Sequence, residues 1–101
     1  MFAIDSQETE GTVLLKLSGE LDTWAAGELD EYLAKLVPTL RKDLVVDLSE
    51  LAFMNSSGLR SFLRLDKLMK GEGMELVIEG ASRSVFKVFR YSGLDGYFTL
   101  R

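Results

Sequence analysis

The stretch that decides the fold runs from Leu44 to Leu59 and reads LVVDLSELAFMNSSGL. Its first part, Leu44 to Leu48, is a short and nearly continuous apolar run, as expected for a central strand covered on both faces. A short turn then leads to two adjacent hydroxyls, Ser56 and Ser57, which open an amphipathic helix. The exposed N-terminus of a helix favours negative charge, so a serine held there can carry a phosphate without unfolding the chain.

Upstream of this stretch, the sequence predicts two strands and one helix. Residues 2–7 and 12–18 show the alternation of an antiparallel strand pair. Asp22 or Thr23 then serves as the N-cap of a helix, which Pro38 ends near Val37. The buried face of that helix has the spacing i, i+3, i+4, i+7, i+8 and consists of Leu29, Tyr32, Leu33, Leu36 and Val37. Trp24 and Tyr32 are interpreted as helix packing rather than as a ligand platform.

Downstream, a second helix is predicted from about Ser57 to Lys70, closed by the glycines of Gly71-Glu72-Gly73. A strand over 74–79 follows, then a short helix capped by Ser82 or Ser84, and an edge strand over 97–100. The resulting order ββαβαβαβ predicts an α/β fold, with helices packed on a mixed β-sheet. We expect one domain over residues 1–101.

Asp66 lies inside the apolar arc of the second helix when the helix is drawn at 100° per residue. One interpretation is that the edge of the arc meets solvent there, or that Asp66 pairs with Lys70 at i+4. The other is that part of this apolar face is exposed and binds a partner.

Composition excludes several functional classes. The chain has 101 residues, 47% hydrophobic, and a net charge of −4 without any basic run, which argues against a nucleic-acid surface. No apolar stretch approaches the ~18 residues of a membrane span, and a signal-peptide pattern is lacking, so we expect a cytoplasmic protein without membrane insertion. Cysteine and histidine are absent, which excludes Ser-His and Cys-His catalysis and the usual zinc sites. We therefore expect no enzyme, no cofactor and no metal site.

The serine-turn motif resembles the signature of STAS domains, specifically that of the bacterial anti-sigma factor antagonists. The resemblance rests on Asp47-Leu48-Ser49 followed by Phe53-Met54-Asn55-Ser56-Ser57-Gly58-Leu59. Three weaker matches agree with it in chain order: Ser18-Gly19-Glu20-Leu21-Asp22, Gly71-Glu72-Gly73, and Phe89-Arg90-Tyr91-Ser92-Gly93-Leu94 with Tyr97-Phe98. The resemblance covers nearly the whole chain.

This resemblance implies a role in partner switching. The unphosphorylated antagonist would bind an anti-sigma factor that is also an ATP-dependent serine kinase, which releases a sigma factor for transcription. The kinase would phosphorylate Ser56, and a metal-dependent serine phosphatase would reverse this. The implied partner-binding residues are Asp22, Met54, Asn55, Ser56, Ser57, Gly58 and Arg60.

The residues of the motif are also open to a structural interpretation. Asn55, Ser56 and Ser57 are all good N-cap residues, so the motif alone is also explained by a plain helix start. Met54 is expected as a surface hydrophobe at the partner interface. Arg60 and Arg64 either contact a partner or phosphate, or form a solvated helix face. Asn55 departs from the family, in which aspartate commonly precedes the first serine, and we expect it to change how a kinase or phosphatase recognises the site.

Two other functions remain open at this point. The first is a constitutive STAS interaction subunit of a membrane transport or other signalling assembly, with the Ser56 turn as a docking surface and no phosphorylation cycle. The second is a small-molecule or nucleotide sensor with an anion site at the Ser56 helix, although the chain lacks a glycine-rich phosphate loop.

Overall fold

Five strands form one mixed sheet in the order β1-β2-β3-β4-β5 in the computed structural model, which describes residues Met1 to Arg101. The strands are β1 (Ala3–Glu8), β2 (Thr12–Leu21), β3 (Asp43–Met54), β4 (Leu76–Glu79) and β5 (Thr99–Leu100). The helices are α1 (Thr23–Leu36), the 3-10 turn η1 (Val37–Thr39), α2 (Ser56–Gly71) and α3 (Arg83–Tyr91). β1 pairs antiparallel with β2 and the other pairs are parallel, so the predicted mixed sheet is confirmed. The order of strands and α-helices along the chain is the predicted ββαβαβαβ. No helix has the length and apolar character needed to cross a membrane.

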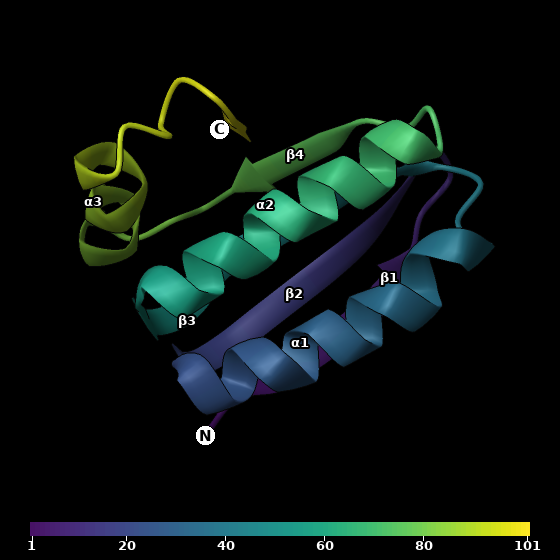
Figure 1. The fold of residues 1–101 in the computed structure, drawn as a ribbon. Helices are drawn as coiled ribbons and strands as arrows, with labels where there is room; N and C mark the ends of the chain where they lie inside the picture. Colours follow the sequence, from purple (N-terminus) through teal and green to yellow (C-terminus); the bar gives the residue numbers. More distant parts are fainter.

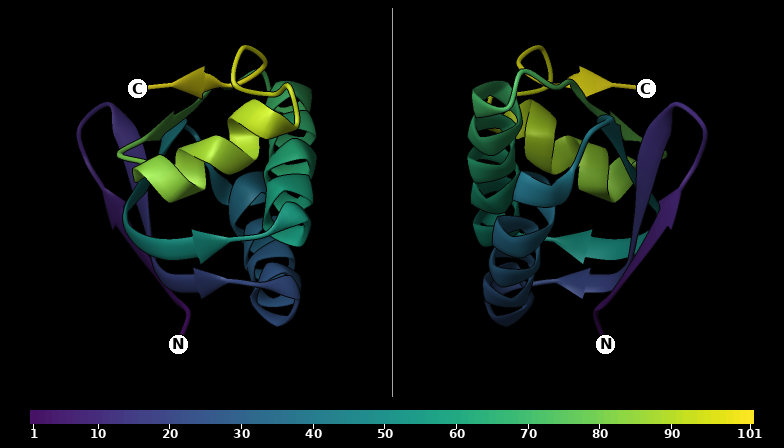
Figure 2. Two further views of the ribbon diagram at one scale, coloured as in Figure 1. Left: turned by 90° about the vertical axis from the view of Figure 1, so that its left-hand side faces the viewer. Right: turned by 90° about the vertical axis from the view of Figure 1, so that its right-hand side faces the viewer.

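The helices α1 and α2 lie side by side on one face of the sheet, and α3 lies beyond the carboxyl end of β4 (Figures 1 and 2). Two successive crossovers between parallel neighbours place both helices on that face, because such crossovers are right-handed. The expectation was that the central strand is covered on both faces, and helices cover one of them. Val45 is nevertheless only 8% exposed, since Leu14 and Val77 flank it in register on the open face.

The central strand β3 is longer than predicted. It extends from Asp43 to Met54 instead of ending at Leu48, and its second half pairs with the end of β2 after two register shifts. The expected turn before the serines is therefore reduced to Asn55, and residues Asn55 to Gly58 are called the serine turn. Asn55 follows the strand directly and caps α2.

One hydrophobic cluster of 24 buried residues holds the layers together. Alternate residues of β2 and β3 point into it, and the buried faces of α1 and α2 cover them. Three rings close the end near α3: Phe89 lies 5.9 Å from Phe62 and 5.5 Å from Phe98 between ring centroids. The core thus fixes α2 over β3, and with it the position of the serine turn.

Asp66 lies at the edge of this core and is paired. Its carboxylate lies 3.0 Å from Lys70 Nζ and accepts a hydrogen bond from the Tyr97 hydroxyl at 2.7 Å. Hydrogen bonding to Asp66, and then to Tyr97, raises the pKa of Lys70. The interpretation of Asp66 as an arc-edge partner of Lys70 is confirmed.

Candidate functional site

Two helices begin next to each other at the carboxyl edge of the sheet. Leu21 and Met54, the last residues of β2 and β3, are register partners in neighbouring parallel strands. Each strand is followed by one N-cap residue, Asp22 for α1 and Asn55 for α2. Since both helices run away from this edge, their N-termini bring two positive dipole ends to one place on the surface (Figure 1).

Asn55 connects the two helix starts. Its Oδ1 accepts hydrogen bonds from the backbone N–H groups of Ser57 at 3.0 Å and Gly58 at 3.2 Å, which satisfies two donors that have no partner inside the helix. Its Nδ2 donates to Thr23 Oγ1 at 3.3 Å, at the start of α1. The Thr23 hydroxyl in turn lies 3.1 Å from the Ser57 hydroxyl. A side-chain amide satisfies both roles at once, accepting from α2 and donating to α1.

Ser56 takes no part in this network. It is the first residue of α2, its side chain is exposed, and its hydroxyl makes no hydrogen bond to the protein. Ser57 differs, because its hydroxyl contacts Thr23 and accepts from Arg60 Nη2 at 3.3 Å. Of the three residues that the motif offers as caps, the structure uses Asn55. The Ser56 side chain therefore has no structural role in the folded chain.

Met54 and Gly58 lie beneath the turn and not on its surface. Met54 is only 3% exposed, so the expectation of a surface hydrophobe at the partner interface is wrong. The reason is the extra length of β3, which carries Met54 to an inward-facing position below α2. Gly58 is also buried, and a Cβ there would lie 2.7 Å from Leu21 Cγ and 2.8 Å from Met54 Cγ. Glycine is required for the helix to approach the strand ends this closely.

The two arginines beyond the serines have different surroundings. Arg64 donates to the Asp30 carboxylate at 2.6 Å and so bridges α2 to α1. Arg60 forms no ion pair, and its hydrogen bond to Ser57 holds it beside the serine turn. Asp22 is exposed and accepts from Ala25 N at 2.9 Å. Asp22, Ser56 and Arg60 thus lie at the surface, whereas Asn55 and Ser57 are partly buried.

Trp24 is a feature of this surface that the sequence interpretation missed. Its side chain is 80% exposed, so its assignment to helix packing is wrong, whereas Tyr32 does pack against the core. A helical projection contained the signal: at 100° per residue Trp24 lies about 140° from Leu29, well away from the buried face. Trp24 follows Thr23, which is hydrogen-bonded to the serine turn.

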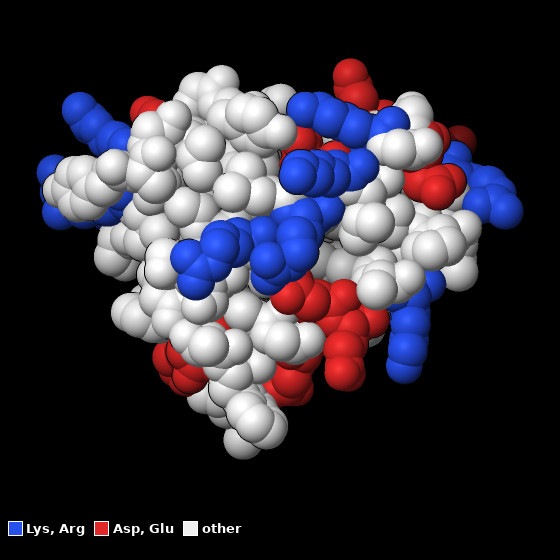
Figure 3. Space-filling model, in the orientation of Figure 1, with Lys and Arg blue, Asp and Glu red and all other residues white.

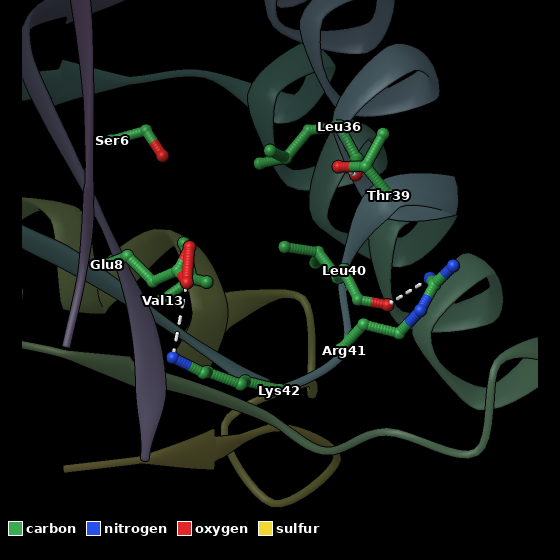
Figure 4. A pocket seen from close by; sticks show the side chains of 8 residues that line it. All are labelled: Ser6, Glu8, Val13, Leu36, Thr39, Leu40, Arg41 and Lys42. Atoms are coloured by element: carbon green, nitrogen blue, oxygen red, sulfur yellow. Dashed lines mark hydrogen bonds and ion pairs between the residues drawn. The ribbon is translucent and has the colours of Figure 1, made fainter. Parts of the chain in front are cut away.

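The hollow shown in Figure 4 lies at the opposite end of the sheet, where β3 begins and α1 ends. Its volume is about 160 Å³. Lys42 pairs with Glu8 at 3.2 Å across its rim, and Arg41 donates to the backbone carbonyls of Leu40 and Pro38. The charges that line this hollow already have partners within the fold.

Comparison with known proteins agrees with this geometry. The family model described as "Mlab, STAS domain" matches residues 4–101. The anti-sigma-B factor antagonist of Bacillus subtilis is 31% identical over 93 residues, which cover 90% of this chain and 83% of that protein. The anti-sigma factor antagonist from Mycobacterium paratuberculosis has a similar structure, with a TM-score of 0.83 and 27% identity over 99% of this chain and 85% of that one.

The fold also matches SpoIIAA, an anti-sigma factor antagonist solved in two states. The TM-score is 0.82 for its unphosphorylated form, with 24% identity over the whole of this chain and 88% of that one. It is 0.73 for the phosphorylated form, again with 24% identity over the whole of this chain and with 91% of that chain covered. From the family match, the relatives and the shared fold, the chain belongs to the STAS domain family, in the group of bacterial anti-sigma factor antagonists.

Proposed function

We propose that this protein is a cytoplasmic binding module that switches partners at Ser56. Unphosphorylated, it binds an anti-sigma factor that is also an ATP-dependent serine kinase, and phosphorylation of Ser56 releases that partner. The observation that carries the proposal is that Asn55 alone caps α2, while the Ser56 hydroxyl is exposed and makes no hydrogen bond within the protein. The Bacillus subtilis relative is named for antagonism of anti-sigma-B factor, which supports the choice of partner.

The modification is a phosphoryl transfer. The γ-phosphoryl group of ATP passes to Oγ of Ser56, ADP leaves, and the hydroxyl proton is released. A metal-dependent phosphatase hydrolyses the ester, which returns the serine hydroxyl and inorganic phosphate. The ATP and the phosphatase metal belong to the partners, and this chain contributes the acceptor and the surface around it.

Electrostatics explains why such a switch acts on binding and not on folding. A phosphate adds roughly −1.5 to −2 charges at neutral pH. The N-terminus of α2 stabilises negative charge by about 0.3–1 kcal/mol, so the folded chain tolerates it. A partner that packs on a neutral hydroxyl must instead desolvate or repel the new charge. A penalty of about 3 kcal/mol there weakens binding by more than a hundredfold.

The surface that a partner meets consists of the exposed Asp22, Ser56 and Arg60, together with the partly buried Asn55 and Ser57. Met54 and Gly58 are buried beneath this surface. Their close packing sets the distance between α2 and the strand ends. Arg60 is one turn beyond the serine and carries the only charge of the first two turns of α2. It is therefore the side chain that responds first to a phosphate on Ser56.

The test is a quantitative pull-down from ATP-depleted native lysate, with wild type, Ser56→Ala and Ser56→Asp as baits and mass spectrometry as the readout. Ser84→Asp is the matched control, because it places the same charge in the first turn of α3. We expect an ATP-dependent serine kinase or anti-sigma factor on wild type, Ser56→Ala and Ser84→Asp, and its loss from Ser56→Asp. Equal retention by all four baits would instead support a constitutive interaction subunit.

A further inference from the structure

Trp24 is the only tryptophan of the chain, and its side chain is exposed to solvent. Its side chain is 80% exposed in the first turn of α1, although nearly all other large apolar side chains of that helix contact the core. Folding gains little from a bulky aromatic held in water. Tryptophan is, however, among the residues most enriched at the energetic centres of protein interfaces.

Trp24 belongs to a stripe along α1. Glu28 and Glu31 follow it at spacings of four and three residues, which places all three on one helix face. With Thr23 and Gly27 they line a shallow depression of about 640 Å³. Glu28 and Glu31 are exposed and neither is in an ion pair. Figure 3 shows acidic side chains gathered over α1 and basic ones along α2.

Gly27 has no explanation within the fold. It lies in the interior of α1, where glycine is less favourable than alanine. Its φ is not positive, and a Cβ built on it would meet nothing within 4 Å. The backbone therefore accepts any small side chain there. Glycine at this position leaves free space in the depression, beside the indole of Trp24.

We propose that Trp24, Gly27, Glu28 and Glu31 form a second arm of the partner interface, which receives a basic segment of the protein that binds at the Ser56 turn. An arginine or lysine of that segment lies against the indole face, in a cation–π contact, and pairs with the two glutamates. The inference rests on the proposed function, because the occupant is the same partner.

The stripe on α1 is continuous with the serine turn, which supports a single partner that contacts both surfaces. Thr23 precedes Trp24, and its hydroxyl lies 3.1 Å from that of Ser57 and 3.3 Å from Asn55 Nδ2. A standard interface covers about 800 Å² on each side, enough to span both patches. The unpaired glutamates supply the charge complementarity: the stripe on α1 beside the serine turn is acidic, so its occupant is basic. Phosphate on Ser56 then weakens binding of the partner, whereas the stripe on α1 strengthens binding of the same partner.

The experiment uses the protein retained by the Ser56→Ala bait, purified and titrated by calorimetry. We expect Trp24→Ala to weaken binding by about 30-fold or more. Glu28→Lys with Glu31→Lys should weaken it at least tenfold. Gly27→Ala should weaken binding severalfold while raising the melting temperature, a combination that a structural role for Gly27 does not produce. The matched control is Tyr91→Ala, an equally exposed aromatic on α3, which should leave the affinity within twofold.

A readout in the wild type makes the result independent of how the variants fold. Because Trp24 is the sole indole of this chain, its emission should shift to shorter wavelength, and acrylamide should quench it less, when a tryptophan-free variant of the partner is added. Unchanged emission and unchanged affinity of Trp24→Ala, with Ser56→Asp still releasing the partner, overturn this inference alone. Loss of binding in Trp24→Ala together with full binding of Ser56→Asp supports the second arm and overturns the switch. A bait that retains no protein contradicts both.

Discussion

At the scale of single residues, Asn55 has two duties that aspartate would perform differently. Its Oδ1 caps α2, and its Nδ2 donates to Thr23. We expect Asn55→Asp to leave the free energy of unfolding nearly unchanged, because the carboxylate keeps the cap and can accept from the Thr23 hydroxyl. Asn55→Ala removes the cap and should lower it by about 1 kcal/mol. Urea denaturation of the three proteins measures this, and an equal loss in both variants would contradict the assignment of Asn55 as the cap.

The same substitution tests how the departure from the family pattern affects phosphorylation. Asn55→Asp adds one negative charge next to Ser56 while preserving the cap, so the rates of phosphorylation and dephosphorylation should differ from those of the wild type. The measurement uses the kinase and phosphatase identified from the pull-down, with radiolabelled ATP. Equal rates in both directions would remove the basis for this expectation, and the capping role would remain.

Two glycines in helices predict opposite effects of one added methyl group. At Gly58 a Cβ would lie 2.7 Å from Leu21 Cγ, so Gly58→Ala should destabilise the fold by about 1–3 kcal/mol. At Gly27 it would meet nothing within 4 Å, and Gly27→Ala should stabilise the fold by about 0.5–1 kcal/mol. Chemical denaturation of both variants under the same conditions measures these two changes in the free energy of unfolding. A stable Gly58→Ala protein would show that α2 can move away from the strand ends.

At the scale of elements, the cluster of Asp66, Lys70 and Tyr97 ties α2 to the segment before β5. Tyr97→Phe leaves the nearly buried Asp66 carboxylate with Lys70 as its remaining partner, and should lower the free energy of unfolding by about 1 kcal/mol. Tyr91→Phe, on an exposed hydroxyl of α3, is the control and should change nothing.

The pH dependence of this cluster follows from the direction of the lysine shift. The pKa of Lys70 is raised in the folded chain, chiefly by hydrogen bonding to Asp66. Its stabilising contribution is therefore complete below the ordinary lysine pKa of 10.5 and is lost as the pH rises through the higher folded value. The difference between wild type and Tyr97→Phe should accordingly be constant from neutral pH up to that range. A difference that disappears near neutral pH would argue against a contribution of Tyr97 to the raised pKa of Lys70.

The order of the elements was predictable from periodicity and caps, but the extent of β3 was not. Alternation and apolar runs report which side chains face the core, and they identified every strand and every α-helix in chain order, whereas the 3-10 turn η1 was not predicted. The second half of β3 is different: Ser49, Glu50, Ala52 and Phe53 are exposed, so the sequence has the composition of a loop there. Its pairing with β2 comes from backbone hydrogen bonds across two register shifts, which no local pattern reports.

The candidate site shows the same limit. The motif predicted a serine at a helix start, yet three residues were candidates for the cap. The full length of β3 places Asn55 directly before α2, where its Oδ1 accepts from the backbone of Ser57 and Gly58. Met54 was misplaced because its burial depends on the length of β3. Trp24 was misplaced although a helical projection separated it from the buried face, because an exposed tryptophan contradicts the usual preference of that residue.

At the scale of the whole molecule, the fold leaves a phosphate on Ser56 nothing to disrupt. The serine stands outside the core and the network of the turn, and SpoIIAA has a fold like this one in both its unphosphorylated and phosphorylated forms. We expect Ser56→Asp to change the free energy of unfolding by between about 0 and +1 kcal/mol, because the new charge lies at the N-terminus of α2.

Backbone amide NMR shifts distinguish a local switch from a conformational one. In Ser56→Asp, changes should be confined to the first turns of α2 and α1, which Asn55 and Thr23 connect, while the amides of β4 and α3 stay in place. Ser84→Asp, with the same charge at the start of α3, should show the reverse distribution. Shifts spread over the whole sheet, or a loss of stability above about 2 kcal/mol, would mean that Ser56 supports the fold and that release of a partner follows from unfolding. Confined shifts leave direct repulsion at the surface as the mechanism, since a partner can then sense only the charge itself.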